Sequence, residues 1–336
     1  MAPPARGITR RSLLAFAAAT PSLLLARRAT AEPGSTFWDM HAHPVVNLRA
    51  GQMPSAASLL SAMDARGIAR TVLSPPPTTG GQGGTEIYGS AELSAVVRQA
   101  PERFAFDAGG DVLNQMLQQT AVSDVTAERL SRFRTEALAI ARAGAAAFAE
   151  LGAEVFAAGK NMPGGHTHQT SPADHPFLHA LAQIAADFAM PIGLHMEALV
   201  AGAGQPENIT AFERLLAANP RTRIVWLHAG WDRTGQRSAS LMQKLLQQHP
   251  NLFMTLKSDH LGSTANAPLT AGGQLKPDWL ALLSAFPDRF VLGSDQFYDR
   301  RLERINNVRR IVDALPADLA RQIGRENPPK IYRLTT

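Results

Sequence analysis

The sequence predicts a single-domain α/β protein, a (β/α)8 TIM barrel, over residues 32–336. Beyond residue 36, eight short apolar runs with strand character alternate with amphipathic helical stretches, the order expected of parallel strands joined by helices. Five of these runs end in His, Glu or Asp, and the active site of such a barrel lies at the carboxyl ends of its strands. The 336-residue chain, 45% hydrophobic, can bury the core that this fold needs.

The expected elements follow one another in a regular order. Strands are expected at residues 37–41, 69–74, 104–108, 146–150, 191–195, 223–228, 252–256 and 289–295. Helices are expected at residues 56–66, 92–99, 127–143, 177–188, 209–218, 238–248 and 279–286. The fourth strand is the least defined, because the alanine-rich stretch 137–158 also suits one continuous helix. Gly144 and Gly152 favour a break there.

Residues 1–31 resemble a twin-arginine export signal. Residues 9–14 read TRRSLL, an apolar stretch follows over 13–26, and residues 29–31, ATA, resemble a small-residue cleavage site. An uncleaved anchor helix is the alternative, but the apolar stretch is interrupted by Pro21 and is shorter than the roughly 20 residues that a membrane span needs. We therefore expect the twin-arginine export machinery as a partner and a periplasmic or secreted location.

Removal of that segment changes the net charge of the chain. The whole sequence has 33 basic and 28 acidic residues, and five of the arginines but none of the acids lie in residues 1–31. The remaining chain is formally neutral, which removes the main support for a nucleic-acid or membrane-surface role. The sequence also has no cysteine, so any metal must be held by nitrogen and oxygen ligands.

The strand ends carry residues that bind metals. His41 and His43 close the first apolar run, and strand alternation places them on one face together with Asp39. Two buried imidazoles are costly unless something accepts their lone pairs, and a metal ion is the usual acceptor. This spacing alone is weak, but four further runs end in a ligand-type residue: Glu150, His195, His228 and Asp295.

This ordered set resembles the metal-dependent amidohydrolase superfamily, most closely its amidohydrolase-related (amidohydrolase 2-like) branch. The matching pattern is His41-X-His43 on strand one, then His195, His228 and Asp295 on strands five, six and eight, and residues 323–327, IGREN, resemble the closing helix of the branch. The branch includes hydrolases of C–N, C–O and P–O bonds and also non-oxidative decarboxylases. The resemblance therefore names no substrate.

The resemblance implies that His41, His43 and Asp295 hold one metal ion, while His195 and His228 hold a second ion or polarise a substrate oxygen. Neutral imidazole and carboxylate suit Zn²⁺, the expected cofactor as one or two ions, and another divalent metal would also fit. Such an ion lowers the pKa of its bound water towards about 7. Asp295 is the expected catalytic residue, which orients the water and passes its proton to the leaving group.

Glu150 distinguishes one metal ion from two. In relatives a strand-four carboxylate, either a glutamate or a carboxylated lysine, bridges a binuclear pair, and Glu150 resembles the glutamate version. The alternative is a surface glutamate on an alanine-rich helix. Lys160 is a second candidate for the strand-four ligand and ranks lower, because it lies beyond the apolar run.

Three further residues are expected near a substrate. Glu197, two residues past the fifth strand's histidine, shares its face in an extended chain and suits a supporting contact. Trp231 suits a pocket wall, and Lys257 after the seventh strand suits either a substrate contact or a solvated charge at the rim. His166 and His168 repeat the His-X-His spacing in a loop without a preceding strand, where exposed histidines are favoured over ligands.

Three functions are compatible with this pattern. The leading hypothesis is a metal-dependent hydrolase that acts on an amide, ester, lactone or related bond of a small molecule. The runner-up is a metal-dependent non-oxidative decarboxylase, which needs one metal and a cationic group such as Arg233 or Lys257 for the carboxylate. The third is a non-catalytic metal-binding barrel, in which a protein side chain would block the water position.

Overall fold

The structure is a computed structural model and describes, besides Met1, residues 35–45, 53–78, 88–155, 169–202, 206–258 and 266–334. The predicted export signal, Lys160, His166 and His168 lie outside the described residues. The corresponding expectations stay predictions.

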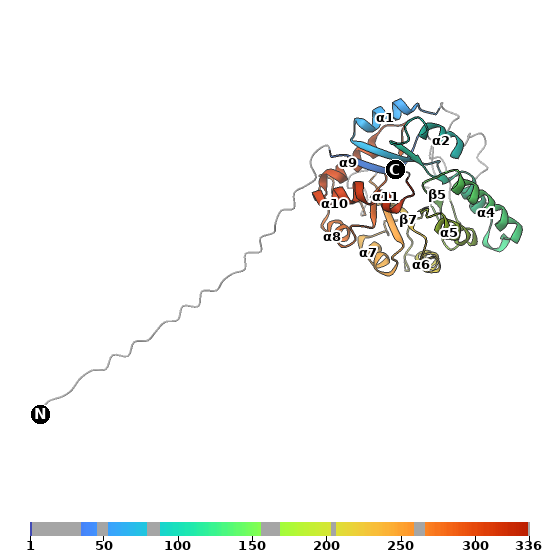
Figure 1. The fold of residues 1–336 in the computed structure, drawn as a ribbon. Coiled ribbons are helices and arrows are strands. Elements are labelled where there is room, and N and C mark those ends of the chain that lie inside the picture. Colours follow the sequence, from blue (N-terminus) through green and yellow to red (C-terminus); the bar gives the residue numbers. More distant parts are fainter. Residues whose placement is uncertain are drawn as a thin grey trace.

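Parallel strands form the barrel at the centre of the molecule (Figure 1). They are β1 Phe37–His43, β2 Ile68–Leu73, β3 Phe104–Phe106, β4 Ala108–Gly109, β5 Phe148–Gly152, β6 Ile192–His195, β7 Ile224–Ala229, β8 Leu252–Leu256, β9 Phe290–Leu292 and β10 Gln296–Phe297. They pair in the orders β10-β1-β2-β3 and β4-β5-β6-β7-β8-β9. Asp107 alone separates β3 from β4, and residues 293–295 separate β9 from β10, so these segments occupy eight barrel positions. The predicted TIM barrel is confirmed.

Helices surround the strands (Figure 1). They are α1 Ala56–Asp64, α2 Ser90–Val97, α3 Val112–Gln118, α4 Ala127–Arg142, α5 Pro176–Asp187, α6 Ile209–Ala218, α7 Ala239–Gln248, α8 Pro277–Ala285, α9 Glu303–Ala314, α10 Ala317–Arg321 and α11 Pro328–Ile331. Ser55, Thr126 and Ser238 cap α1, α4 and α7, because each side chain accepts a hydrogen bond from a backbone N–H of the first turn. All seven predicted helices are present within a few residues.

The ambiguous fourth strand exists. Helix α4 ends at Arg142, and Gly144 adopts a φ of 88°, a left-handed conformation that suits glycine. The chain then enters β5, which begins two residues later than predicted and places Glu150 at its middle. The alternative of one continuous helix is wrong, because the glycine turn redirects the chain into the barrel.

The first strand departs from the predicted alternation. The pairing of β1 with β2 has a register shift between Asp39 and Ala42, an irregularity typical of barrel rims beside active sites. Met40 joins an apolar cluster with Val72 and Val291 on other strands. The expectation that Asp39, His41 and His43 share one face is therefore wrong for Asp39, whose carboxylate instead accepts hydrogen bonds from Ser294.

The C-terminal segment covers the amino-terminal end of the barrel. Ile331 and Tyr332 pack into the same apolar cluster as Met40, and the Arg333 backbone N–H donates to the carbonyl of Ala146, just before β5. This packing leaves the opposite end, where the strands terminate, to carry the polar residues. Residues Gln322–Glu326, which overlap the predicted closing helix at 323–327, form a π-helical turn between α10 and α11.

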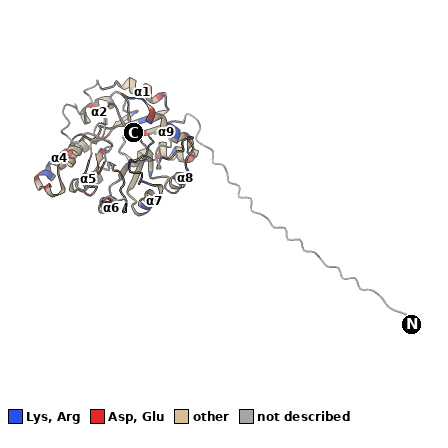
Figure 2. Cartoon of the chain, turned by 180° about the vertical axis from the view of Figure 1, so that it is seen from behind, with Lys and Arg blue, Asp and Glu red and all other residues tan. Residues whose placement is uncertain are grey.

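Basic and acidic residues both occur along the helices of the chain (Figure 2). On α4, for example, Glu128 and Glu136 alternate with several arginines. No described helix is long and apolar enough to cross a membrane.

Candidate metal centre

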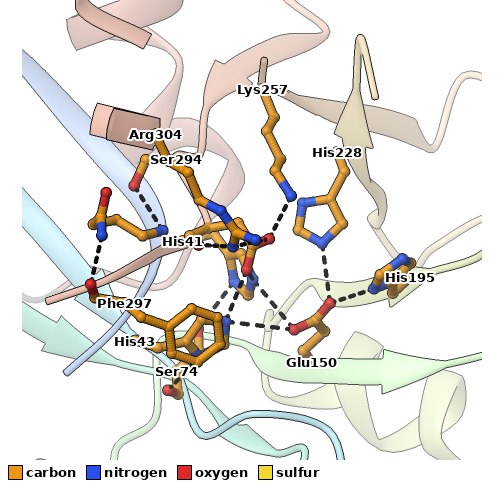
Figure 3. Close-up of polar contacts among 12 residues, drawn as sticks. His41, His43, Ser74, Glu150, His195, His228, Lys257, Ser294, Phe297 and Arg304 are labelled. Atoms are coloured by element: carbon orange, nitrogen blue, oxygen red, sulfur yellow. Dashed lines mark hydrogen bonds and ion pairs between the residues drawn. The ribbon is translucent and has the colours of Figure 1, made fainter. Parts of the chain in front are cut away.

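Six ligand-type side chains meet at the carboxyl ends of the barrel strands (Figure 3). They come from β1, β5, β6, β7 and the turn after β9: His41, His43, Glu150, His195, His228 and Asp295. Each is at most 2% exposed. The ligand atoms fall into two groups, each within 4.8 Å: one contains His41, His43, Glu150 and Asp295, and the other contains Glu150, His195 and His228.

Glu150 belongs to both groups. Its Oε1 lies 2.6 Å from Nδ1 of His195 and 3.0 Å from Nε2 of His228. Its Oε2 lies 3.4 Å from Nε2 of His41 and 3.6 Å from Nε2 of His43. One carboxylate thus faces two pairs of imidazoles through its two oxygens, the arrangement that a bridging ligand requires.

Asp295 faces the first group and two cations. Its Oδ1 lies 3.0 Å from Nε2 of His43, and its Oδ2 accepts hydrogen bonds from Lys257 and, at 2.7 Å, from Arg304. Burial raises the pKa of the Asp295 carboxyl, but the positive charges of Arg304 and Lys257 and the neighbouring histidines outweigh it. Its pKa is therefore held well below the usual range, and the group is anionic.

Two buried carboxylates, Glu150 and Asp295, face the four imidazoles of the cluster. Burial would raise the pKa of Glu150, yet the hydrogen-bond contacts with His195 and His228 and the nearby imidazole of His41 hold it well below the usual value. Burial lowers the pKa of His41, but the nearby carboxylates of Glu150 and Asp295 raise it to about 9. A cation among these groups is therefore strongly favoured, whether it is a proton or a metal ion.

A divalent ion fits the donor set. Among the described residues, neither Nε2 of His41 nor Oε2 of Glu150 makes a hydrogen bond, although both atoms are buried. Buried polar atoms are costly without a partner, and both face the same space as the Nε2 of His43. Nitrogen and carboxylate oxygen donors without thiolate suit Zn²⁺ or a comparable divalent ion.

The backbone presents two of these residues in left-handed conformations. His228 has a φ of 66° and Asp295 a φ of 55°, values that cost energy for residues other than glycine. The buried Arg237 donates to the carbonyls of Trp226 and Leu227 and so holds the chain just before His228. Packing and hydrogen bonds thus maintain the conformation that the site needs.

The predicted substrate residues lie beside the cluster. The ring of Trp231 is 6.2 Å from that of His228, edge to face, and the Lys257 ammonium lies 4.2 Å from the Trp231 ring centroid. Lys257 is only 1% exposed, so the alternative prediction that it is a solvated charge at the rim is wrong. Glu197 is also buried, and its Oε1 lies 3.6 Å from Nε of Arg233, which stacks on Trp231.

Three residues of the site were not singled out from the sequence. Ser74 directly follows β2, Asp107 lies between β3 and β4, and Arg304 belongs to α9. A signal existed for Asp107, since the apolar run 104–106 ends in this carboxylate just as other runs end in ligands. Ser74 ends the second predicted strand and is too common a residue type to stand out, and α9 was not predicted.

A family model described as "Amidohydrolase" matches residues 38–334. The chain belongs to this amidohydrolase family. The match spans nearly all of the barrel and confirms the resemblance inferred from the strand-end residues. A comparison with curated protein sequences found no match.

Solved structures share the fold at low identity. An uncharacterized TIM-barrel protein from Bordetella bronchiseptica is 16% identical, with a TM-score of 0.55 over 88% of this chain and 98% of that one. A dihydroxybenzoic acid decarboxylase from Polaromonas, solved with bound manganese and 2-nitroresorcinol, is 13% identical, with a TM-score of 0.52 over 88% and 96%. The 4-oxalomesaconate hydratase from Rhodopseudomonas palustris is 13% identical, with a TM-score of 0.50 over 89% and 96%.

Proposed function

We propose that this amidohydrolase-family protein is a metal-dependent hydrolase of a small-molecule amide, ester, lactone or related bond. The observation that carries the proposal is the position of Glu150, which faces both groups of ligand atoms. In this assignment His41, His43, Glu150 and Asp295 hold one ion, and Glu150, His195 and His228 hold a second. Zn²⁺ is the proposed metal, and Mn²⁺ is the second choice because a structural neighbour is described with manganese.

The ions would acidify a water molecule and polarise the substrate oxygen. The chain's own residues hold and orient the reactants. Asp295 stays anionic because Arg304 and Lys257 contact its Oδ2, so its Oδ1 remains directed at the histidines. There it can accept a hydrogen bond from the attacking water and orient it. Trp231, beside His195 and His228, supplies an apolar wall for the substrate.

Metal analysis combined with a substrate-class screen tests this proposal. Purified protein reconstituted with Zn²⁺ is expected to contain about two ions per chain and to hydrolyse at least one class among amides, esters, lactones and phosphotriesters. The double variant His41→Ala/His43→Ala should lose the first ion and the activity. His249→Ala is the matched control, because His249 lies at the end of α7 and contacts Glu213 instead. Unchanged activity without metal in the double variant would overturn the proposal.

A decarboxylase is the second candidate, and the cations favour it. Lys257 and Arg304 both contact Asp295, and Arg233 lies over the Trp231 ring. A substrate carboxylate could exchange for these contacts, and loss of CO₂ needs an anion-binding group of this kind. Glu150 belongs to both groups of ligand atoms, which favours two bound ions and therefore the hydrolase. One bound ion per chain together with CO₂ release from aromatic or enoic acids would decide for the decarboxylase.

A non-catalytic metal-binding barrel is the third candidate. In that case metal would bind with the stoichiometry above, while no substrate class in the screen would react. Lys257 is a candidate for such a role, because its ammonium contacts Oδ2 of Asp295 and lies close enough to His228 to lower the pKa of that imidazole. A Lys257→Ala variant that gains hydrolase activity, from a wild type inactive on every class, would favour this candidate.

A further inference from the structure

The two histidines of β1 share one partner on the neighbouring strand. Nδ1 of His41 lies 3.0 Å from the hydroxyl oxygen of Ser74, and Nδ1 of His43 lies 2.9 Å from its backbone carbonyl oxygen. Figure 3 shows Ser74 beneath the cluster, on the side of the imidazoles away from Glu150. Ser74 is fully buried, and its own N–H donates to the carbonyl of Ala42 between the two histidines. Its position relative to β1 is therefore fixed.

The carbonyl contact determines the tautomer of His43. A carbonyl oxygen only accepts hydrogen bonds, so Nδ1 of His43 must carry a proton, and in the neutral imidazole Nε2 then holds the lone pair. That lone pair points towards the carboxylates of Glu150 and Asp295. This contact uses backbone alone and persists whatever side chain stands at position 74.

The hydroxyl contact leaves the tautomer of His41 open, because a hydroxyl both donates and accepts. The direction depends on where the Ser74 proton goes. Asp107, between β3 and β4, is fully buried. His41 and Ser74 lie close enough to lower the pKa of its carboxyl, but burial has the larger effect and raises that pKa. Both carboxylate oxygens of Asp107 are buried and, among the described residues, make no hydrogen bond. An ionised carboxylate only accepts hydrogen bonds, so Asp107 is a potential acceptor for the proton of the Ser74 hydroxyl.

We propose that Ser74 is a positioning residue: its hydroxyl accepts the Nδ1–H of His41, donates towards Asp107, and thereby directs the Nε2 lone pair of His41 into the metal centre. The orphaned Nε2 of His41 then faces Glu150 Oε2 at 3.4 Å as a ligand atom. This inference deepens the proposed function and rests on it where metal binding is concerned. Partners of this kind typically change metal affinity by about 10- to 100-fold.

The tautomer can be read directly in the metal-free protein. Long-range ¹H–¹⁵N spectra of protein labelled at histidine distinguish an imidazole protonated at Nδ1 from one protonated at Nε2. At a pH well above 9, where the neutral form of His41 predominates, its proton is expected on Nδ1 in the wild type and at least partly on Nε2 in Ser74→Ala. His43 should keep its Nδ1 proton in both proteins. A wild-type His41 with its proton on Nε2 overturns the inference.

Metal titration provides the second arm. Zn²⁺ should bind the first site of Ser74→Ala about 10- to 100-fold more weakly than the wild type, and Asp107→Asn should weaken it in the same direction. Ser171→Ala is the matched control: Ser171 is also buried, but its hydroxyl donates to the carbonyl of Leu117 on α3. Equal Zn²⁺ affinity of Ser74→Ala and Ser171→Ala overturns the inference. Absence of Zn²⁺ binding by the wild type would overturn the proposed function instead, and the spectra would still decide the tautomer.

Discussion

The ammonium group of Lys257 donates a hydrogen bond to Oδ2 of Asp295, and each side chain is at most 2% exposed. These residues follow β8 and β9, and the parallel pairing of these two neighbouring strands brings them together. A buried ion pair is costly to form, and breaking it by removing one partner is strongly destabilising. Asp295 is thus fixed as an anion at the centre of the site, a state that suits a ligand and an orienting group.

Substitution of Lys257 tests this pairing. Lys257→Met should lower the free energy of unfolding by about 3 kcal/mol, the lower end of the range for a broken buried pair, because Arg304 still contacts Asp295. It should also raise the pKa of Asp295, so the acid limb of the pH–activity profile should move to higher pH. Urea unfolding and pH–rate profiles measure both effects. Lys244→Met on the exposed face of α7 is the control, and matching profiles for the two variants would contradict the prediction.

Glu150→Gln tests the two-ion arrangement. The amide keeps the size of the side chain but removes the charge that offsets two cations, so metal content should fall from about two ions per chain to one or none. Elemental analysis after dialysis measures this ratio. Glu154→Gln serves as the control, since Glu154 lies just beyond β5 and outside both ligand groups. Retention of both ions by Glu150→Gln would show that the carboxylate does not bridge them.

The metal-free protein should lose stability with rising pH. The pKa of His41 in the folded state is about 9, above the value of about 6.5 for an unfolded chain. A histidine whose pKa is raised by folding stabilises the protein below its unfolded pKa, and this contribution disappears as the pH rises through 9. The melting temperature of chelator-treated protein should therefore fall between pH 6.5 and 9. The slope should be smaller in His41→Gln, and an equal slope in both proteins would argue against this assignment.

The export prediction has its own test. Twin-arginine signals are recognised through the paired arginines, so Arg10→Lys/Arg11→Lys should keep the protein in the cytoplasm with its first 31 residues attached. Fractionation and mass spectrometry of the N-terminus measure location and cleavage. Arg27→Lys/Arg28→Lys, which changes the other arginine pair of the segment, should leave export intact. Equal distribution of the two double variants would remove the support for this route.

The barrel and the metal-binding residues could be predicted because their signals are local. Strands in a closed parallel barrel are short apolar runs, and a histidine or carboxylate that ends such a run is unusual enough to stand out at His195 or Asp295. Helix α9 was not predicted, although its buried Ile305, Val308 and Ile311 recur every three residues, a local pattern typical of an amphipathic helix. The sequence does not show which strands these residues pack against. Local patterns contain no information about such partners.

The irregularities of the site also required the structure. The register shift in β1 and the left-handed conformations of His228 and Asp295 arise from contacts with distant residues. The roles of Ser74 and Arg304 depend on their distances from His41 and Asp295, which no spacing in the sequence encodes. The sequence therefore predicts which residue types gather at the strand ends, while their hydrogen-bond partners follow from barrel closure.

Gly293→Ala should disturb the metal centre without touching a ligand. An added Cβ at Gly293 would lie 3.1 Å from Cβ of His41 and 3.0 Å from Cβ of Thr255, and the Thr255 hydroxyl accepts the backbone N–H of His228. Relief of this contact must move one strand-end histidine or both, so Zn²⁺ affinity should fall about 10-fold or more, at a cost of about 1–3 kcal/mol in folding stability. Gly272→Ala is the control, because an added Cβ there meets its nearest neighbour at 3.7 Å. Wild-type Zn²⁺ affinity in a folded Gly293→Ala protein would mean that the close approach of β9 to His41 does not set the ligand geometry.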